Sequence, residues 1–542
     1  MFTLSRRQMV GALSGAVATG MFANGQFRPA FAQAAAEAPK RGGTFVMALG
    51  ANPEHLNASI SSSVMVALPA QGITEGLIRI NGKFQPEPVL ATSWQVSPDG
   101  KRITFNLRQG VKWHDGKPFT SADVKYSLEK LTPLHARSAS VFKNVASIEA
   151  QGDHTVIVTL KEPFGPFLDL LTADNVGIQP AHLYAGTDLL KNPANLRPVG
   201  TGPFKFDAWQ TGQSITFVRN ADYWDKGKPY LDKFVFRIIP DSNTRSLALE
   251  AGDIDYIPSY DMSSNDAVRL KKTKGIKVST GRGMPRVLLL FFNNKKKPFD
   301  DPRVRKALLQ GLDRQIMLSS AFNDIGGLGT SSIPQGLSWA NNPEVNYVKM
   351  YPLDVERANR ELDQAGLPRG ADGTRFIARF TFDPAQSGYT DIAEIVRSNW
   401  QKLGVKVVLE ARERNVWLNM VYTAKDYDTS IAWYATNGDP ALGIDRAYKC
   451  DEVRPAAFTN ASQYCNPALD DLLRKGATAV RKEDRAQFYR QAQSIVARDL
   501  PTAVLIDSGY ADAMRDNFGN LPAFFESPND TQLQYGEIFR KN

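Results

Sequence analysis

The chain has 542 residues, of which 42% are hydrophobic and 10% aromatic, a composition that supports large packed cores and excludes a disordered protein. Its 65 basic and 56 acidic residues give a formal charge of +9, but the surplus is spread thinly. The densest cluster, Lys295-Lys296-Lys297, is typical of a solvated turn, so we expect no nucleic-acid partner.

The first 32 residues resemble an export signal. Arg6 and Arg7 precede a short apolar run, and Ala30-Phe31-Ala32 has the form of a cleavage site. The run is too short and too rich in glycine to span a bilayer. The paired arginines resemble a twin-arginine signal, although Met9 replaces the phenylalanine that is usual there, so Sec export stays open. Either route predicts a mature chain that works in the periplasm.

The mature chain opens with a predicted strand within residues 40–50 and a polar loop, Asn52–Asn57. Further on, Thr120 and Asp123 predict a capping box at the start of a helix that runs to Leu131. The pair His114-Asp115 could suggest catalysis, but Asp-Gly is turn chemistry. We therefore interpret this pair as structural.

The segment from Pro198 to Asp255 carries the strongest motif. In the turn Gly200–Phe204 (G-T-G-P-F) we expect glycine to supply unusual backbone angles and proline to fix φ. Apolar residues then alternate around Ile215–Phe217 and Phe234–Ile238, which predicts strands with one buried face.

From residue 286 to about 500, predicted strands alternate with predicted helices, as in an α/β lobe. The predicted strands are Val287–Phe292, Phe376–Phe382, Val405–Leu409 and Thr429–Trp433. The predicted helices are Leu353–Ala365, Asp391–Leu403, Val416–Ala424, Asn466–Ala479 and Lys482–Arg498. Asp301 as N-cap before Pro302 predicts a further helix start, and residues 500–506 form a further, largely apolar run after the last predicted helix.

Cys450 and Cys465 are the only cysteines. In an oxidising compartment we expect a disulfide between them, with two separate buried thiols as the alternative. No histidine lies near either cysteine in the sequence, so we expect no metal site there.

Four motifs follow one another between Gly200 and Asp255: G-T-G-P-F, R-N-x-x-Y-W, K-P-Y-L-D and A-G-D-I-D. In this order they closely resemble the signature of the family-5 solute-binding proteins, the extracytoplasmic receptors of ABC importers for peptides, nickel, opines and related solutes. The block Leu77–Leu131 is also similar to that family. The resemblance implies an α/β fold, a two-lobed periplasmic binding protein of type II, in the large three-subdomain variety, with a hinged ligand cleft. It implies a signal peptide over 1–32, lobe I over 33–75, 198–285 and 505–542, an accessory subdomain over 76–197, and lobe II over 286–504.

The ligand is expected beside the loop Trp433–Pro440, because open α/β sheets bind ligands outside the carboxyl ends of their strands. Peptide-binding relatives place an aspartate three residues after this tryptophan to pair the peptide amine, and Thr436 stands there in this chain. Dipeptide-binding relatives hold the carboxylate with an arginine in the loop that corresponds to Asp383–Tyr389, which contains none. Free dipeptides are therefore disfavoured, while longer peptides, opines and sugar conjugates stay open.

Arg412 or Arg414 could supply a positive anchor for an acidic solute, with simple surface exposure as the alternative. The predicted ligand-binding residues are Asn52, Asn57, Tyr389, Arg414, Trp417, Trp433, Tyr434, Thr436, Asn437 and Asp439.

The sequence contains no G-x-S-x-G, H-E-x-x-H or G-x-x-x-x-G-K-[ST] motif, so we expect no enzyme, no catalytic residue and no cofactor. We predict a monomeric periplasmic receptor that captures a peptide or peptide-like solute and delivers it to an ABC permease in the inner membrane. The alternatives are a receptor for an opine, a sugar conjugate or a chelated metal, a secreted hydrolase, and a chaperone-like or sensor protein.

Overall fold

The computed structural model describes residues 39–135, 138–280, 285–507, 509–525 and 532–541. The predicted signal peptide lies outside these residues. No helix among the described residues is long and apolar enough to cross a membrane.

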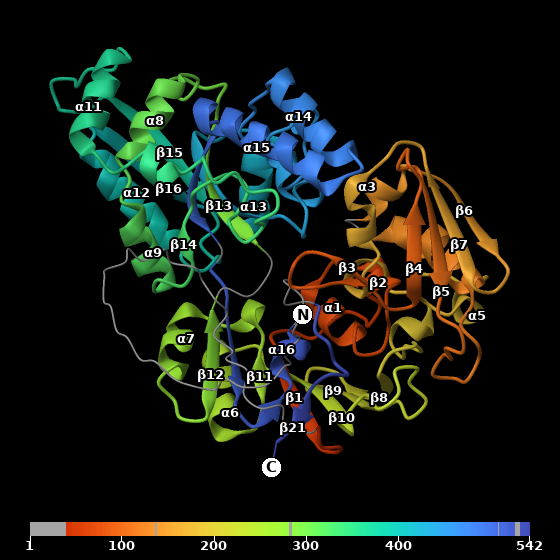
Figure 1. The fold of residues 1–542 in the computed structure, drawn as a ribbon. Coiled ribbons are helices and arrows are strands. Elements are labelled where there is room, and N and C mark those ends of the chain that lie inside the picture. Colours follow the sequence, from red (N-terminus) through yellow and green to blue (C-terminus); the bar gives the residue numbers. More distant parts are fainter. Residues whose placement is uncertain (1–38, 136–137, 281–284, 508, 526–531, 542) are drawn as a thin grey trace, which may run out of the picture. The chain divides into compact units, whose positions relative to one another are not determined.

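A seven-stranded sheet has the order β12-β19-β11-β1-β10-β9-β8 (Figure 1). Its strands are β1 (Thr44–Leu49), β8 (Phe204–Gln210), β9 (Ser214–Arg219), β10 (Lys233–Ile238), β11 (Tyr256–Ile257), β12 (Ile276–Thr280) and β19 (Ala511–Arg515). The predicted alternation is confirmed: in β10, Phe234, Phe236 and Ile238 are buried while Lys233 and Arg237 are exposed. Phe234 and Phe236 pack into one aromatic-rich core with residues of the neighbouring strands.

The glycine-proline turn is needed for a reason other than the predicted one. Neither Gly200 nor Gly202 has a positive φ. Instead, a Cβ on Gly200 would lie 1.9 Å from the carbonyl oxygen of Ile73, and one on Gly202 would lie 2.6 Å from it. The expectation of unusual backbone angles is wrong here, because a close approach between two backbones is what excludes a side chain.

A four-stranded antiparallel sheet, β4-β5-β7-β6, is formed by β4 (Ala91–Val96), β5 (Arg102–Leu107), β7 (Thr155–Leu160) and β6 (Val145–Gln151). The predicted capping box is confirmed at α2 (Ser121–Tyr126), which continues as a π-helical turn to Leu131. His114 links this part of the chain to the glycine turn, since its Nδ1 accepts the Gly200 N–H at 3.2 Å and its Nε2 lies 3.0 Å from the Gly202 carbonyl oxygen. This contact supports the structural interpretation of His114.

A six-stranded sheet has the order β14-β18-β13-β17-β15-β16. Its strands are β13 (Arg286–Phe292), β14 (Gly327–Leu328), β15 (Phe376–Phe382), β16 (Val405–Ala411), β17 (Thr429–Ala435) and β18 (Thr502–Asp507). The chain passes from the seven-stranded sheet to this one between β12 and β13, and returns between β18 and β19. The return follows Asp507, so residue 505, where lobe I was expected to resume, lies inside β18.

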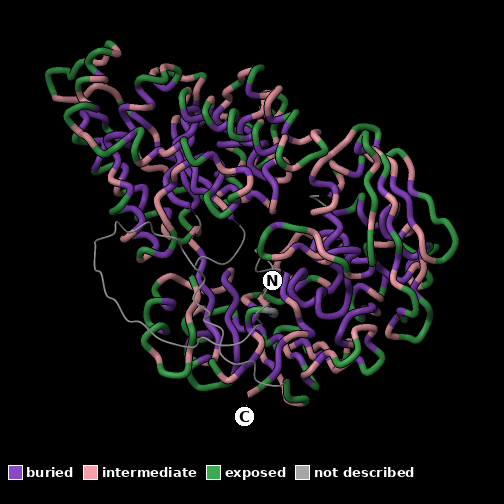
Figure 2. Tube along the Cα trace, in the orientation of Figure 1, coloured by how far each residue is buried: buried purple, intermediate pink, exposed green. Residues whose placement is uncertain are grey.

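The helices around the six-stranded sheet are α8 (Pro302–Gln310), α9 (Arg314–Phe322), α10 (Tyr347–Met350), α11 (Val355–Gln364), α12 (Tyr389–Gln401), α13 (Arg414–Leu418), α14 (Pro467–Thr478) and α15 (Lys482–Asp499). The predicted ones begin and end close to the predicted positions, except that the helix expected over Val416–Ala424 is α-helical only to Leu418 and continues as a π-helical turn to Thr423. Helices α9 and α10 were not predicted. Asp301 caps α8 by accepting the Arg303 N–H, with Pro302 at the first position, as predicted. Figure 2 shows buried residues along the strands of this sheet, and Leu288–Phe292 in β13 are at most 1% exposed.

The remaining helices and strands are short. They are α1 (Val64–Ala70), α3 (Ser138–Phe142), α4 (Ala173–Val176), α5 (Ala181–Tyr184), α6 (Ser242–Ala251), α7 (Ser264–Leu270), α16 (Leu521–Phe524), β2 (Ile78–Ile80), β3 (Pro86–Pro88), β20 (Phe518–Gly519) and β21 (Phe539–Arg540). The predicted disulfide is confirmed between Cys450 and Cys465.

Candidate ligand-binding site

Three strands of the six-stranded sheet end at one edge. Strand β15 pairs in parallel with both β16 and β17, so the carboxyl ends of all three meet there. Asp383 follows β15, Arg414 lies three residues after β16, and Trp433 lies near the end of β17. Strand β13 begins at the same edge, with Arg286 opposite Ala435. Side chains from four distant segments therefore gather where open α/β sheets bind ligands.

Tyr389, the first residue of α12, connects these segments. Its hydroxyl oxygen accepts the Trp433 N–H at 3.1 Å, and its side chain is almost fully buried. Burial raises the pKa of Tyr389, while the charges of Arg286 and Arg414 act in the opposite direction. The phenol therefore stays protonated, and two guanidinium groups lie within electrostatic range of it.

Arg286 lies between two aromatic rings. Its Cζ is 4.2 Å from the ring centroid of Trp433 and 3.8 Å from that of Tyr510. Tyr510 in turn contacts Tyr260, with ring centroids 5.5 Å apart. Arg286 and Tyr510 stand beside the two passages between the sheets, so this stack of rings lies where the chain connects its two halves. The sequence prediction missed Arg286, Tyr510 and Tyr260, and the only local signal was that Arg286 precedes a continuous apolar strand.

Arg414 and Asp383 form an ion pair at the same edge. Arg414 Nη1 donates to Asp383 Oδ2 at 3.2 Å, and the side chains are 44% and 1% exposed, respectively. Asp383 also accepts the Ala385 N–H at 3.0 Å. The carboxylate is therefore part of the folded loop, whereas the guanidinium it holds faces outward.

Two predicted ligand-binding residues, Trp417 and Tyr434, belong to the core instead. They are 1% and 0% exposed. Trp417 Nε1 donates to the Ser430 hydroxyl at 3.0 Å, and the Tyr434 hydroxyl donates to the Thr459 carbonyl at 2.6 Å. Successive residues of a strand point to opposite faces of the sheet, so Trp433 and Tyr434 could not line one wall together.

The loop after β17 is largely occupied by its own contacts. Thr436 is fully buried, and its hydroxyl donates to the Pro285 carbonyl at 3.2 Å. Asn437 adopts φ 52° and donates its amide to the Leu442 carbonyl at 2.8 Å. The structure thus gives Thr436 an internal role at the position where ligand contact was expected, and Asn437 stays half-buried beside it.

Asp439 is also internal. Both of its carboxylate oxygens accept from Arg485 Nη2 at 2.7 Å, and the two side chains are at most 5% exposed. A Cβ on Gly165 would lie 2.6 Å from Arg485 Nε, so the loop that carries Gly165 packs directly on this pair. Asp439 therefore holds the structure together and is not available to a solute.

Two of the three predicted asparagines, Asn52 and Asn57, belong to the other half of the chain. Asn57 is 1% exposed and donates to Asn195 Oδ1 at 2.8 Å, while its own oxygen caps a 3₁₀ turn through the Ser59 N–H. Asn52 is exposed, and its oxygen accepts the Gly212 N–H at 2.9 Å in the turn between β8 and β9. Asn57 is therefore a core residue, contrary to expectation.

A polar cavity of about 310 Å³ lies away from this edge, near the glycine-proline turn. Glu75, which lines it, accepts hydrogen bonds from Thr201, Tyr223 and Trp224 at 2.7–2.9 Å. Burial raises the pKa of Glu75 to about 7, although these donors act against the rise. Lys228 at the rim is already paired with acidic neighbours. The donors to Glu75 come from the predicted motif segment, so this segment has a structural role in closing on the buried carboxyl group.

Among the described residues, no group of three or more His, Cys, Asp or Glu side chains could hold a metal ion.

An α/β chain that passes twice between two sheets, with ring stacking and guanidinium groups at one strand edge, has the architecture of a type II periplasmic binding protein. The family model of the bacterial extracellular solute-binding proteins, family 5, matches residues 85–454. The chain belongs to this family, which confirms both the resemblance seen in the sequence and the predicted fold class.

Individual relatives cover most of the chain. It is 31% identical over 445 residues to heme-binding protein A of Haemophilus influenzae, with 78% of each chain covered. It is 26% identical to the glutathione-binding protein GsiB of Escherichia coli K12, with 90% of this chain and 94% of the relative covered. The structure of the periplasmic binding protein DppA from Helicobacter pylori in complex with the peptide STSA matches with a TM-score of 0.73 at 26% identity, covering 93% of this chain and 99% of that one.

Proposed function

We propose that this protein is an extracytoplasmic receptor of an ABC importer, which binds a peptide or peptide-like solute and passes it unaltered to an inner-membrane permease. The observation that carries the proposal is the cluster of Tyr389, Trp433, Arg286 and Arg414 at the carboxyl edge of the six-stranded sheet. Aromatic surface with a few fixed polar groups is typical of a small-solute site.

The connections between the two sheets support a hinged receptor. Among the elements that the structure describes, the chain changes from one large sheet to the other at two places, between β12 and β13 and between β18 and β19. Arg286 and Tyr510 stand beside these segments and stack on each other, so a change of angle between the sheets would move the aromatic cluster directly. We assign lobe I to the seven-stranded sheet, with the four-stranded sheet as its accessory subdomain, and lobe II to the six-stranded sheet.

The relatives support the same class of solute. A tetrapeptide, glutathione and haem appear in the names of similar proteins, and each is a flexible or flat molecule with carboxyl groups. Opine or sugar-conjugate acids would satisfy the same cluster, so they belong in any ligand screen.

Thermal unfolding of the mature protein, residues 33–542, tests the proposal against Ser-Thr-Ser-Ala, reduced glutathione and haem. A ligand at 100 times its Kd stabilises the folded state by about 2.7 kcal/mol, and mass spectrometry should recover it unchanged. Trp433→Leu should abolish the shift, whereas Trp209→Leu, at a half-buried tryptophan of the seven-stranded sheet, should keep it. Turnover of a ligand, or the absence of any shift across a broad screen, would contradict the proposal.

We also propose that residues 1–32 direct export by the twin-arginine route and that the mature protein is a periplasmic monomer. Replacement of Arg6 and Arg7 by lysine should retain the full-length chain in the cytoplasm. Continued export of the doubly substituted chain would identify Sec as the route. Light scattering of the mature protein measures its mass directly.

A further inference from the structure

We infer that Arg414 is the anchor for a carboxylate of the solute, so that the protein selects solutes with a free carboxyl group next to an apolar or aromatic part. The inference rests on the proposed function and names the chemical class of its ligand.

The protein orients the Arg414 side chain but uses only part of its hydrogen-bonding capacity. Asp383 fixes one side of its guanidinium through Nη1 at 3.2 Å, and among the described residues this is the only hydrogen bond of the Arg414 side chain. A guanidinium has five N–H donors in a planar fork, and a second edge of that fork matches the two oxygens of a carboxylate. Because Asp383 is 1% exposed and Arg414 is 44% exposed, the free edge points away from the buried partner.

The local charge also favours an anion. Arg286 and Arg414 both lie within electrostatic range of the Tyr389 hydroxyl, where Asp383 is the acidic neighbour. The other acid of this loop, Glu413, accepts the Asn415 N–H at 2.9 Å and caps α13. Both acids of this loop are therefore already held by the protein. A carboxylate of the solute would meet the outward side of the Arg414 guanidinium with opposite charge, while a neutral amide would not.

Aromatic residues lie near the same anchor. Arg414 Cζ lies 5.9 Å from the ring centroid of Phe458, and Trp433 donates its backbone N–H to the Tyr389 hydroxyl beside it. A solute held by its carboxylate would therefore place its neighbouring atoms against apolar surface.

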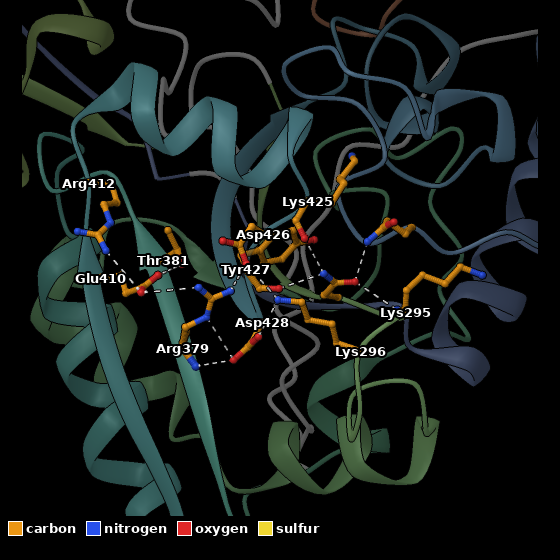
Figure 3. Close-up of polar contacts among 12 residues, drawn as sticks. Lys295, Lys296, Arg379, Thr381, Glu410, Arg412, Lys425, Asp426, Tyr427 and Asp428 are labelled. Carbon is orange, nitrogen blue, oxygen red and sulfur yellow. Dashed lines mark hydrogen bonds and ion pairs between the residues drawn. The ribbon is translucent and has the colours of Figure 1, made fainter.

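Arg412, two residues earlier, has the same charge and nearly the same exposure but a different neighbourhood. It lies 3.5 Å from Glu410, whose second oxygen accepts the Thr381 hydroxyl at 2.9 Å. Figure 3 shows Arg412 and Glu410 as part of a surface network that also contains Arg379 and Asp428. The charge of Arg412 is thus balanced on the outer face of the sheet, which makes Arg412 a matched control.

Native mass spectrometry with paired probes tests the inference. The mature protein is mixed with equal amounts of Ser-Thr-Ser-Ala and its C-terminal amide, and separately with reduced glutathione and its dimethyl ester. We expect the free acids to be retained at least tenfold over the neutral forms, which corresponds to about 1.4 kcal/mol. Arg414→Gln should abolish this preference, Arg414→Lys should keep part of it, and Arg412→Gln should leave it unchanged.

The outcomes separate the two proposals. Equal retention of acid and neutral forms by the wild type, or an unchanged preference in Arg414→Gln, would overturn the carboxylate anchor while the receptor function stands. If the wild type retains neither form of any probe, and haem and opine acids also fail to bind, the proposed receptor function is contradicted. The carboxylate anchor is then contradicted as well, because it depends on that function. Circular dichroism of Arg414→Gln checks that the variant is folded.

Discussion

Two arginine–aspartate pairs in the six-stranded half of the chain have different roles, although they consist of the same residue types. In Arg485–Asp439 both side chains are at most 5% exposed, both carboxylate oxygens are bound at 2.7 Å, and Arg485 Nε donates to the Gly476 carbonyl at 2.6 Å. In Arg414–Asp383 only the carboxylate is buried. The difference is in the arginine: Arg485 is enclosed and its donors are directed at the protein, while Arg414 keeps an edge for something else.

Electrostatics follows the same division. Burial opposes the charge of Arg485, but the Asp439 carboxylate and Tyr489 together outweigh burial and raise the pKa of Arg485. A buried pair of this kind adds little net stability compared with an apolar pair, yet it is costly to break from one side. Arg414 stays hydrated on one side, so its loss should cost the fold far less.

Asp439→Asn should have the largest effect. It leaves the buried Arg485 charge without the carboxylate to which it is hydrogen-bonded, and we expect the free energy of unfolding to fall by about 3–5 kcal/mol. Urea unfolding of the mature protein measures this loss. Asp484→Asn is the matched control, because Asp484 pairs with the exposed Arg481 on the same helix and should leave the midpoint unchanged. Equal midpoints for Asp439→Asn and wild type would remove the contrast between the two pairs.

Removal of the disulfide should cause the second-largest loss of unfolding free energy. Cys450 and Cys465 are 15 residues apart, and the loop they close carries Phe458, which packs near Arg414, and Thr459, which accepts the Tyr434 hydroxyl. In the chain-entropy model, opening a loop of this length costs about 3 kcal/mol. The double variant Cys450→Ser/Cys465→Ser should lose this amount in urea unfolding under oxidising conditions. Reduced wild-type protein should match the double variant, and a stable reduced form would contradict the estimate.

The buried pair also makes stability depend on pH. Burial and the Asp439 charge raise the pKa of Asp445 from 3.8 to about 8, and burial raises that of Asp169 to about 7. In the folded protein these carboxyl groups keep their protons above pH 4, whereas the unfolded chain releases them. Stability should therefore be greatest at acid pH and decline as the pH rises toward 8.

Asp445→Asn tests this dependence. The decline in unfolding free energy between pH 5 and pH 8 should shrink by more than about 1.4 kcal/mol, the equivalent of one pKa unit. Asp451→Asn, at an exposed aspartate 3.8 Å from Lys449, should leave the decline as it is. A decline of the same size in Asp445→Asn would show that the buried acids do not control it.

Local patterns predicted most of the fold. Alternation and continuous apolar runs placed β9, β10, β13 and β15–β17, because burial of a face leaves a direct trace in the sequence. The caps of α2 and α8 were predictable since they satisfy backbone donors within a few residues. The glycine turn was located but misexplained, because the Ile73 carbonyl that it must avoid is remote in sequence.

The cluster at the carboxyl edge of the six-stranded sheet was predicted in part, while its role as a ligand site stays a prediction. Tyr389, Arg414 and Trp433 lie close together because they border strands that pair in parallel. Arg286 and Tyr510 could not be predicted, since only the antiparallel pairing of β13 with its neighbours brings them to this edge. Asp439 was wrongly predicted to bind the ligand because its partner Arg485 lies on a helix 46 residues later. No local sequence pattern predicts that pairing.

Arg414→Gln should have the smallest effect on the fold and the largest on ligand choice. The exposed guanidinium contributes less than about 1 kcal/mol through its pair with Asp383, and glutamine can still donate to that carboxylate. We therefore expect a urea midpoint close to wild type, together with loss of the preference for free carboxyl groups. A loss of stability as large as that of Asp439→Asn would mean that Arg414 is a structural residue like Arg485. In that case exposure would not distinguish the two pairs, and the reason for assigning the outward edge of Arg414 to a solute would disappear.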